Sequence, residues 1–458
     1  MPPRNNVFAR AIPYAEKDVY KAYSGVYWDP ERRTWMVPLE VRTEYELAER
    51  KISCADRLLP FQTIAVQRAL QDGVGFMFNF DTGCGKSYAA MGTCHELAAQ
   101  HVLIVCPPMV VEHWRALTTE WGYTPAVVGE EHADLGSDVV LVSYHQLSSI
   151  VAAQLRYDAI ILDESHKIKN GAKGKLENAP AIVRYVHQLR DASPQAFRML
   201  LTATMFPNKP DDGWAQLDWV WPGRFGTYWK YVARYHEITH EKIPNTEKTK
   251  IVIGPPRNTE ELRDRLRWCS MVVTKGEVPG LPPWDACMED DWESALNTLD
   301  STSWVLTDTR DRVEFLAQRY PNLIAFHGAA SIKKRHALIS EAKASGRPVV
   351  STMHSVREGI DLTHWNRVLY DQLSWTMLAI VQSMGRFHRL SSKNPVQYLF
   401  NGADRRRARV LVRKLQEIRA IIPTTLPLEE YIQQKYDQET LEAELAAVDF
   451  GGEEWAEA

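Results

Sequence analysis

The 458-residue sequence has no hydrophobic run long enough to cross a membrane. Its longest apolar stretches, such as HVLIVCPPMVV at 101–111, are about half the length that a membrane span needs. The first residues, MPPRNNVFARAIPY, lack the apolar stretch of a secretory signal peptide. The six cysteines include no CxxC pair, so neither a zinc site nor a disulfide framework is indicated. We therefore expect a protein of a reducing cytoplasm that has no contact with membranes.

A strong charge of one sign is also missing, because the net charge is only −4. Ten acidic residues and one lysine lie between Glu429 and the C-terminus, so this tail carries −9 and the rest of the chain about +5. A weakly basic body with an acidic tail neither requires nor excludes a nucleic-acid partner. Charge therefore excludes no function class here.

Internal repeats and long low-complexity linkers are absent too, and the length implies more than one domain. Short apolar strands alternate with amphipathic helices in two regions, and this alternation predicts βαβ units with parallel sheets. The strands of the first region read VGFMFNF, HVLIVCPP, DVVLVSY, YDAIILDE and FRMLLTAT, and those of the second SWVLTDT, LIAFHG, RPVVSTM and RVLYDQL. The predicted order is a strand-turn-strand-helix module at 1–52, an α/β domain at 53–238, a connector at 239–295, a second α/β domain at 296–425 and an acidic tail at 426–458.

A glycine loop opens a helix directly after the first of these strands, in DTGCGKSYAAMG. Glycines in such a loop let backbone N–H groups approach phosphate oxygens, and the helix N-terminus adds partial positive charge. The lysine can reach the terminal phosphates and the serine hydroxyl can ligate Mg²⁺. Phe80 replaces the first glycine of the strict pattern, as is common in superfamily 2 enzymes, which keep the inner GxGK[ST]. The predicted ATP-binding residues are Thr82, Gly83, Cys84, Gly85, Lys86 and Ser87.

Two adjacent carboxylates, Asp163 and Glu164, end the strand YDAIILDE. At the carboxyl end of a parallel strand they would face the same crevice as the phosphate loop. Asp163 would hold Mg²⁺, together with Ser87, and Glu164 would act as general base on the attacking water. His166 completes a DESH box, in which it would link the ATP site to the next motif. Gln62, in LLPFQTIAV, stands where superfamily 2 proteins read the adenine edge.

The second α/β domain contains a QxxGRxxR pattern with Gln382, Gly385, Arg386 and Arg389. Arginines one helical turn apart share a face. Facing the γ-phosphate across a domain cleft, Arg386 and Arg389 would act as arginine fingers supplied by the same chain. We therefore predict a catalytic set of Lys86, Asp163, Glu164, Gln382, Arg386 and Arg389.

These motifs, taken in order, resemble those of the Swi/Snf-type DNA-dependent ATPases of helicase superfamily 2. GRFHRLSSKNPV is similar to the family's GRxHRxGQ segment, Trp375 stands where the family places a tryptophan, and the resemblance covers roughly 55–400. It implies two tandem RecA-like domains with the ATP cleft between them. Departures such as Ser392 for the usual glutamine, DESH for DEAH, LTAT for LTGT and Val273 for an arginine suggest a divergent member, of viral or bacterial origin. The expected compartment is thus the cytoplasm of a bacterium or of a phage-infected host.

The resemblance also implies roles for residues outside the ATP motifs. Thr202 and Thr204 of LTAT would couple hydrolysis to movement of the second domain, and Gly359 and Asp361 would contact nucleotide or backbone at the cleft. DNA would be bound chiefly through its phosphates, so binding should be independent of sequence and sensitive to salt. The candidates for nucleic-acid contact are His113, Trp114, Ser143, Tyr144, Ser351 and Thr352.

Two further segments have open interpretations. WDPERRTWMVPLE, near the N-terminus, resembles the strand pair of the HARP module of annealing helicases, or is a small cap on the first sheet. The basic run ADRRRARVLVRKLQEIR would clamp DNA or form a solvated helix face. The expected function is an ATP-driven translocase on duplex or branched DNA. The alternatives are a DExH-type RNA or single-strand helicase, a non-catalytic nucleic-acid-binding scaffold, and the motor subunit of a defence complex.

Overall fold

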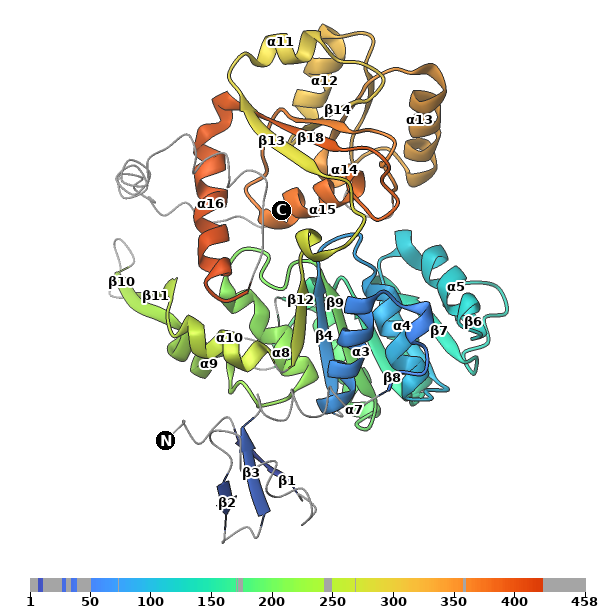
Figure 1. Ribbon diagram of the computed structural model, residues 1–458, viewed down its shortest axis with the longest axis vertical. Helices are drawn as coiled ribbons and strands as arrows, with labels where there is room; N and C mark the ends of the chain where they lie inside the picture. Colours follow the sequence, from blue (N-terminus) through green and yellow to red (C-terminus); the bar gives the residue numbers. More distant parts are fainter. Residues whose placement is uncertain are drawn as a thin grey trace. The chain divides into compact units, whose positions relative to one another are not determined.

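The computed structural model describes residues 7–10, 27–29, 34–38, 51–72, 74–169, 171, 176–242, 249–267, 269–356 and 360–422. These residues divide into two compact units (Figure 1). Among the described residues, unit 1 comprises those up to Glu277 together with Ala420–Ile422, and unit 2 comprises those from Val278 to Arg419. The acidic tail, Gly359 and the helical stretch predicted before residue 51 lie outside the described residues.

Unit 1 contains a seven-stranded sheet in which every neighbouring pair is parallel. Five central strands are buried at every position, which explains their continuous apolar sequences, because helices cover both faces of a parallel sheet. In spatial order the strands are β12 (Ser270–Val273), β4 (Gly75–Phe80), β9 (Phe197–Thr202), β8 (Ala159–Asp163), β5 (Val102–Cys106), β7 (Val139–Ser143) and β6 (Pro125–Val127).

The helices of unit 1 connect these strands, and α3 and α4 pack against β4 (Figure 1). An antiparallel hairpin of β10 (His236–Lys242) and β11 (Thr249–Pro256) follows the last crossover helices. A separate antiparallel sheet near the N-terminus has the order β1-β3-β2, from Val7–Arg10, Thr34–Pro38 and Tyr27–Asp29. The helices are α3 (Pro60–Asp72), α4 (Lys86–Glu96), α5 (Val111–Glu120), α6 (Leu147–Ala153), α7 (Ala181–Ala192), α8 (Trp214–Val220), α9 (Tyr228–Tyr235) and α10 (Thr259–Arg267).

Unit 2 contains a six-stranded, all-parallel sheet. Its core includes Val305, Leu316, Val350 and Leu369, and a fully buried Trp304 whose indole packs against Trp365. The strands in spatial order are β13 (Trp284–Glu289), β18 (Val396–Asn401), β17 (Arg367–Tyr370), β14 (Ser303–Thr307), β16 (Val349–Thr352) and β15 (Ile324–Phe326). The helices are α11 (Trp292–Asn297), α12 (Arg310–Arg319), α13 (Ile332–Ser345), α14 (Met353–Val356), α15 (Met377–Phe387) and α16 (Arg405–Arg419).

The two parallel sheets confirm the predicted pair of α/β, RecA-like domains, and every strand predicted from the alternation is present. The region 239–295, predicted as a connector, holds the β10–β11 hairpin, α10, β12 of the first sheet and β13 of the second. At the N-terminus, β2 and β3 form the predicted strand pair, and β1 adds a third strand. Within the described part of the chain, no helix has both the length and the apolar character to span a membrane.

Candidate nucleotide site

The phosphate loop lies between the end of β4 at Phe80 and the start of α4 at Lys86. Gly83 and Gly85 have φ angles of 84° and 75°, in the left-handed region that costs glycine no steric penalty. Lys86 Nζ donates to the backbone oxygen of Phe80 at 2.9 Å, so the lysine folds back over the loop. The loop thus directs a lysine and the N-terminus of an 11-residue helix toward one place, which is the arrangement that binds phosphates.

Gln62, at the start of α3, is buried against this loop. Its Nε2 donates to the backbone oxygens of Cys84 and Gly85, at 3.3 and 3.4 Å, and its Oε1 accepts from the N–H of Leu59. A Cβ atom added to Gly85 would meet Gln62 Nε2, so a side chain there would displace Gln62 and would also strain the left-handed backbone. In this structure Gln62 therefore supports the phosphate loop, and its reading of adenine stays a prediction.

Two other loop residues are buried, namely Thr82 and Cys84. Burial, followed by the nearby Asp81, raises the pKa of the Cys84 thiol to about 11, so this cysteine is a neutral packing group at physiological pH. Asp81 fastens the loop to the end of β12: its N–H donates to Val273 O at 2.8 Å, and its carboxylate accepts the N–H of Lys275 at 2.9 Å.

Asp163 is the last residue of β8, two strands from β4, and its carboxylate is held on both oxygens. Trp114 Nε1 on α5 donates to Oδ2 at 2.9 Å, and the N–H of Glu164 donates to Oδ1 at 3.0 Å. Tyr144 adds a hydrogen bond from its hydroxyl to the backbone oxygen of Asp163. Burial, and next the negative charge of Glu164, raises the pKa of Asp163. A buried carboxylate next to a half-buried one is a good site for a divalent cation, which would relieve both effects.

Glu164 has a φ of 54°, in the left-handed region that non-glycine residues seldom adopt. This conformation directs the chain into the short 3₁₀ turn Ser165–Ile168. His166 is buried there, with Nδ1 3.3 Å from Glu164 Oε2. The predicted general base and the histidine of the DESH box therefore contact each other.

The DESH box is joined to the loop after LTAT by a buried side chain that the sequence did not single out. Ser165 Oγ donates to Gln216 Oε1 at 2.7 Å, and Gln216 Nε2 donates to Met205 O at 2.8 Å. All three residues have no exposed surface. Thr202 and Thr204 lie just before Met205, and Thr204 N donates to Thr202 Oγ1 at 3.0 Å. Gln216 on α8 is thus the physical connection between the two motifs.

The residues predicted to contact nucleic acid do not share one surface. His113 is exposed, whereas Trp114 and Tyr144 are buried. Both of these donate hydrogen bonds to Asp163. Ser143 is hydrogen-bonded to Gln146, and Ser351 accepts the indole N–H of Trp304 in the core of unit 2. Thr352 is buried as well. In this structure Trp114, Tyr144 and Ser351 are therefore internal hydrogen-bonding groups, because each lies under other side chains.

In unit 2, Gln382 and Arg386 lie on α15, both buried. Arg389 does not continue this helix, because α15 ends at Phe387 and His388 is extended. Its guanidinium returns to the helix end, donating to Gly385 O at 2.9 Å and to Ile360 O at 3.2 Å. The expectation that both arginines share a helix face is therefore wrong. Burial, and next the charge of Arg386, lowers the pKa of Arg389 to about 10, which leaves it charged at neutral pH.

Asp361 lies near this helix end, in the loop after the undescribed Gly359. It is exposed, and its Oδ1 accepts the N–H of Thr363 at 3.0 Å. Burial alone would raise the pKa of Asp361, but the hydrogen bonds from Thr363 and the charges of Arg389 and Lys343 together hold that pKa below its usual value. The contact of Asp361 with a nucleotide stays a prediction.

Two protein-family models match successive parts of the chain. "Type III restriction enzyme, res subunit" matches residues 53–207, and "Helicase conserved C-terminal domain" matches residues 293–391. Together they cover the phosphate loop, the DESH box, LTAT and the QxxGR segment.

Curated relatives match part of the chain. The "DNA excision repair protein ERCC-6-like" of Danio rerio is 24% identical over 247 residues, covering 45% of this chain and 16% of that protein. The "DNA annealing helicase and endonuclease ZRANB3" of Bos taurus is 24% identical over 196 residues, covering 39% of this chain and 17% of that protein. The chain thus spans less than a fifth of the length of these relatives.

Among solved structures, the "Sulfolobus solfataricus SWI2/SNF2 ATPase core in complex with dsDNA" aligns with 80% of this chain and 97% of that one, at 17% identity and a TM-score of 0.42. The two family models and the curated relatives support the resemblance seen in the motifs: this chain is similar to the helicase-like ATPases of superfamily 2, of the Swi/Snf type.

Proposed function

We propose that this protein is a DNA-dependent ATPase that uses ATP and Mg²⁺ to move along duplex or branched DNA. The observation that carries the proposal is that a lysine-bearing phosphate loop and a carboxylate pair lie at the carboxyl ends of β4 and β8, two strands of one parallel sheet that are separated by β9, with the charge of Lys86 acting on Asp163. That combination is the working part of P-loop nucleotide hydrolases. The names of the two relatives, a DNA excision repair protein and a DNA annealing helicase, favour DNA as the substrate.

The residues present fit both ATP and Mg²⁺. Lys86 and the first turn of α4 would hold the phosphate oxygens, and Ser87 and Asp163 would hold the metal ion. Magnesium supplies charge neutralisation at the phosphates. Glu164, adjacent to Asp163 and in contact with His166, would take the proton from the attacking water. The hydrogen bond from Trp114 to Oδ2 fixes the direction of the Asp163 carboxylate. The other oxygen, Oδ1, accepts the N–H of Glu164 and would ligate the metal ion.

Unit 2 would contribute Gln382, Arg386 and Arg389 to the transition state. For these groups to reach a nucleotide held by unit 1, the two units must close on it, and opening after hydrolysis would move one unit along the DNA. Contacts to DNA would be mainly to phosphates, with His113 as the exposed candidate among those named. We expect little processive strand separation, as the family resemblance implies.

The test is steady-state ATP hydrolysis by wild type and Lys86→Ala, with Lys230→Ala, an exposed lysine on α9, as the control. Each variant is assayed without nucleic acid and with duplex DNA, forked DNA, single-stranded DNA or RNA, at one salt concentration. We expect stimulation by duplex or forked DNA that Lys86→Ala abolishes and Lys230→Ala retains. Stimulation by RNA alone would favour the DExH-type RNA helicase. Hydrolysis under no condition would favour the scaffold, or a motor subunit that needs its partner.

A further inference from the structure

Helix α16 carries six arginines and one lysine among its 15 residues. Its apolar side, with Leu411, Leu415 and Ile418, is buried. A basic helix of this kind usually binds an anionic partner or faces solvent. The contacts of α16 within unit 2 show a different use for part of this charge.

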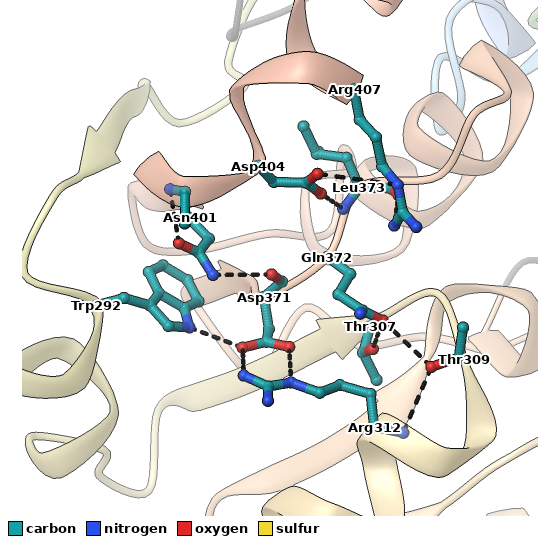
Figure 2. Close-up of polar contacts among 11 residues, drawn as sticks. Trp292, Thr307, Thr309, Arg312, Asp371, Gln372, Leu373, Asn401, Asp404 and Arg407 are labelled. Carbon is teal, nitrogen blue, oxygen red and sulfur yellow. Dashed lines mark hydrogen bonds and ion pairs between the residues drawn. The ribbon is translucent and has the colours of Figure 1, made fainter.

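Two side chains near the start of α16 hold one residue of the loop between β17 and α15. Asp404 Oδ2 accepts the backbone N–H of Leu373 at 2.7 Å, and Arg407 Nη1 donates to the backbone oxygen of the same residue at 2.7 Å. Figure 2 shows Asp404 and Arg407 on either side of Leu373. Both backbone hydrogen-bonding groups of Leu373 are therefore satisfied by charged side chains, which make stronger bonds than neutral ones.

The same helix holds the next part of this loop, at Trp375. Lys414 Nζ donates to the backbone oxygen of Trp375 at 2.8 Å. The guanidinium carbon of Arg407 lies 5.1 Å from the centre of the Trp375 ring, within the range of a cation–π interaction. Arg407 thus bonds to the loop backbone and contacts the loop's only aromatic side chain.

The beginning of the loop is fixed from other elements. The Asp371 carboxylate is fully buried and accepts two hydrogen bonds from Arg312, at 2.7 and 2.9 Å, and one from Trp292 Nε1 at 2.8 Å (Figure 2). Gln372 Oε1 accepts the hydroxyls of Thr307 and Thr309. Asp371 and Gln372 are thus held from α11, α12 and the end of β14, and the contacts with α16 hold Leu373 and Trp375 after them.

The charge of Arg407 is neutralised within unit 2. Its guanidinium lies 3.7 Å from Asp308 Oδ2 and 3.8 Å from Asp404 Oδ1, and its side chain is 21% exposed. A residue that binds DNA phosphates offers an exposed and uncompensated charge. Arg407 is therefore a poor phosphate ligand and a well-placed internal one.

Helix α15 begins at Met377, two residues after Trp375, and carries Gln382 and Arg386. We propose that α16 positions this helix: Arg407, with Asp404 and Lys414, holds the 373–375 loop and thereby sets where Arg386 stands. This inference rests on the proposed function, in which Arg386 contributes to the transition state of ATP hydrolysis. Arg407 is a positioning residue, which acts on the reaction through the loop and α15.

The test compares Arg407→Ala with Arg406→Ala, which removes the same charge from the exposed neighbouring position of α16. With saturating duplex DNA, kcat for ATP should fall about tenfold in Arg407→Ala, because Arg386 would no longer be held in place. A tenfold fall corresponds to a loss of about 1.4 kcal/mol in transition-state stabilisation. KM for ATP and the Kd of a fluorescent ATP analogue should stay within about twofold, because the phosphate loop lies in unit 1. Arg407→Lys should recover part of kcat, since it keeps a charged donor but lacks the planar fork.

Three results would overturn the inference. One is an unchanged kcat in Arg407→Ala. Another is a fall in melting temperature with an unchanged kcat per folded molecule, which would show a purely structural role. The third is weaker DNA binding with a salt dependence reduced by about one phosphate contact, which would make Arg407 a DNA ligand.

Hydrogen exchange separates failure of this inference from failure of the proposed function. Amide exchange in α15 should accelerate in Arg407→Ala and not in Arg406→Ala, whether or not the protein hydrolyses ATP. A wild type without ATPase activity would contradict the proposed function, while unchanged exchange in Arg407→Ala would contradict the positioning role.

Discussion

Replacement of Trp114 by phenylalanine isolates one hydrogen bond at the predicted magnesium carboxylate. Trp114 is completely buried, and its Nε1 donates to Asp163 Oδ2 at 2.9 Å. Phenylalanine keeps most of the buried ring and removes the N–H. A hydrogen bond to a charged group contributes about 1.5–3 kcal/mol. Because that bond favours the ionised carboxylate, its loss should raise the pKa of Asp163.

The direction of this change is fixed by the surroundings of Asp163. Burial, and next the charge of Glu164, already raises its pKa, whereas the bond from Trp114 lowers it. Only the deprotonated carboxylate can ligate Mg²⁺. In Trp114→Phe, activity should therefore be lost at a higher pH as the solution is acidified, and should approach that of the wild type at alkaline pH.

The assay is kcat/KM for ATP between about pH 5.5 and 9, with the Mg²⁺ requirement for binding a fluorescent ATP analogue as a second readout. Trp219→Phe is the matched control, because Trp219 is equally buried in unit 1 and its Nε1 donates to Val186 O at 2.8 Å. If the acid limbs of Trp114→Phe and wild type coincide, or if Trp219→Phe shifts its limb equally, the reasoning is refuted.

Three further substitutions test other contacts. Gly85→Ala should raise KM for ATP at least tenfold, because its Cβ would meet Gln62; Gly223→Ala, with a similar φ but open space, controls for backbone strain in a nucleotide titration. Gln216→Leu and Ser165→Ala should show a coupling of about 1 kcal/mol in a double-mutant cycle on DNA-stimulated kcat, whereas strict additivity would mean that the two do not act together. Arg312→Ala should lower the free energy of unfolding of unit 2 by about 3–5 kcal/mol, since it leaves the fully buried Asp371 without its charged partner; a loss below about 1 kcal/mol in denaturant unfolding would contradict this.

The parts of the fold that the sequence predicts are those encoded locally. A continuous apolar run such as AIIL in β8 predicts a buried strand, because both faces of such a strand are covered. The phosphate loop and the carboxylate pair can be predicted because their chemistry needs fixed residue types at fixed spacing. The sequence analysis did not predict the short strand β12, SMVV. Four residues in a region rich in Pro, Gly and Trp are too few to show a hydrophobic periodicity, and only the pairing with β4 identifies the strand.

Helix ends and side-chain destinations depend on tertiary contacts. The QxxGRxxR spacing suggested a single helix through Arg389, yet the chain turns at His388, whose ring is hydrogen-bonded to Pro282 O, and Ser392 Oγ accepts the N–H of Arg389. Trp114 was predicted to lie on a DNA-facing loop because it follows a strand end. Its burial follows from the packing of α5 against β7 and β6, which brings the indole to Asp163 and which no local pattern encodes.

A residue that the sequence analysis overlooked is one that holds the motif segments in place and has no reaction chemistry of its own. Gln216 is the clearest case, because a glutamine in WAQLDWV looks like an ordinary polar position of a helix. Its buried amide has one accepting and one donating end, and each end has a partner, Ser165 and Met205. Turning the amide around would oppose its oxygen to the backbone oxygen of Met205, which can only accept, so the orientation of the amide is fixed. A shift of the DESH turn must therefore move α8, move the loop after LTAT, or break a fully buried hydrogen bond. In this way a neutral side chain can transmit a change at the ATP site to the loop after LTAT.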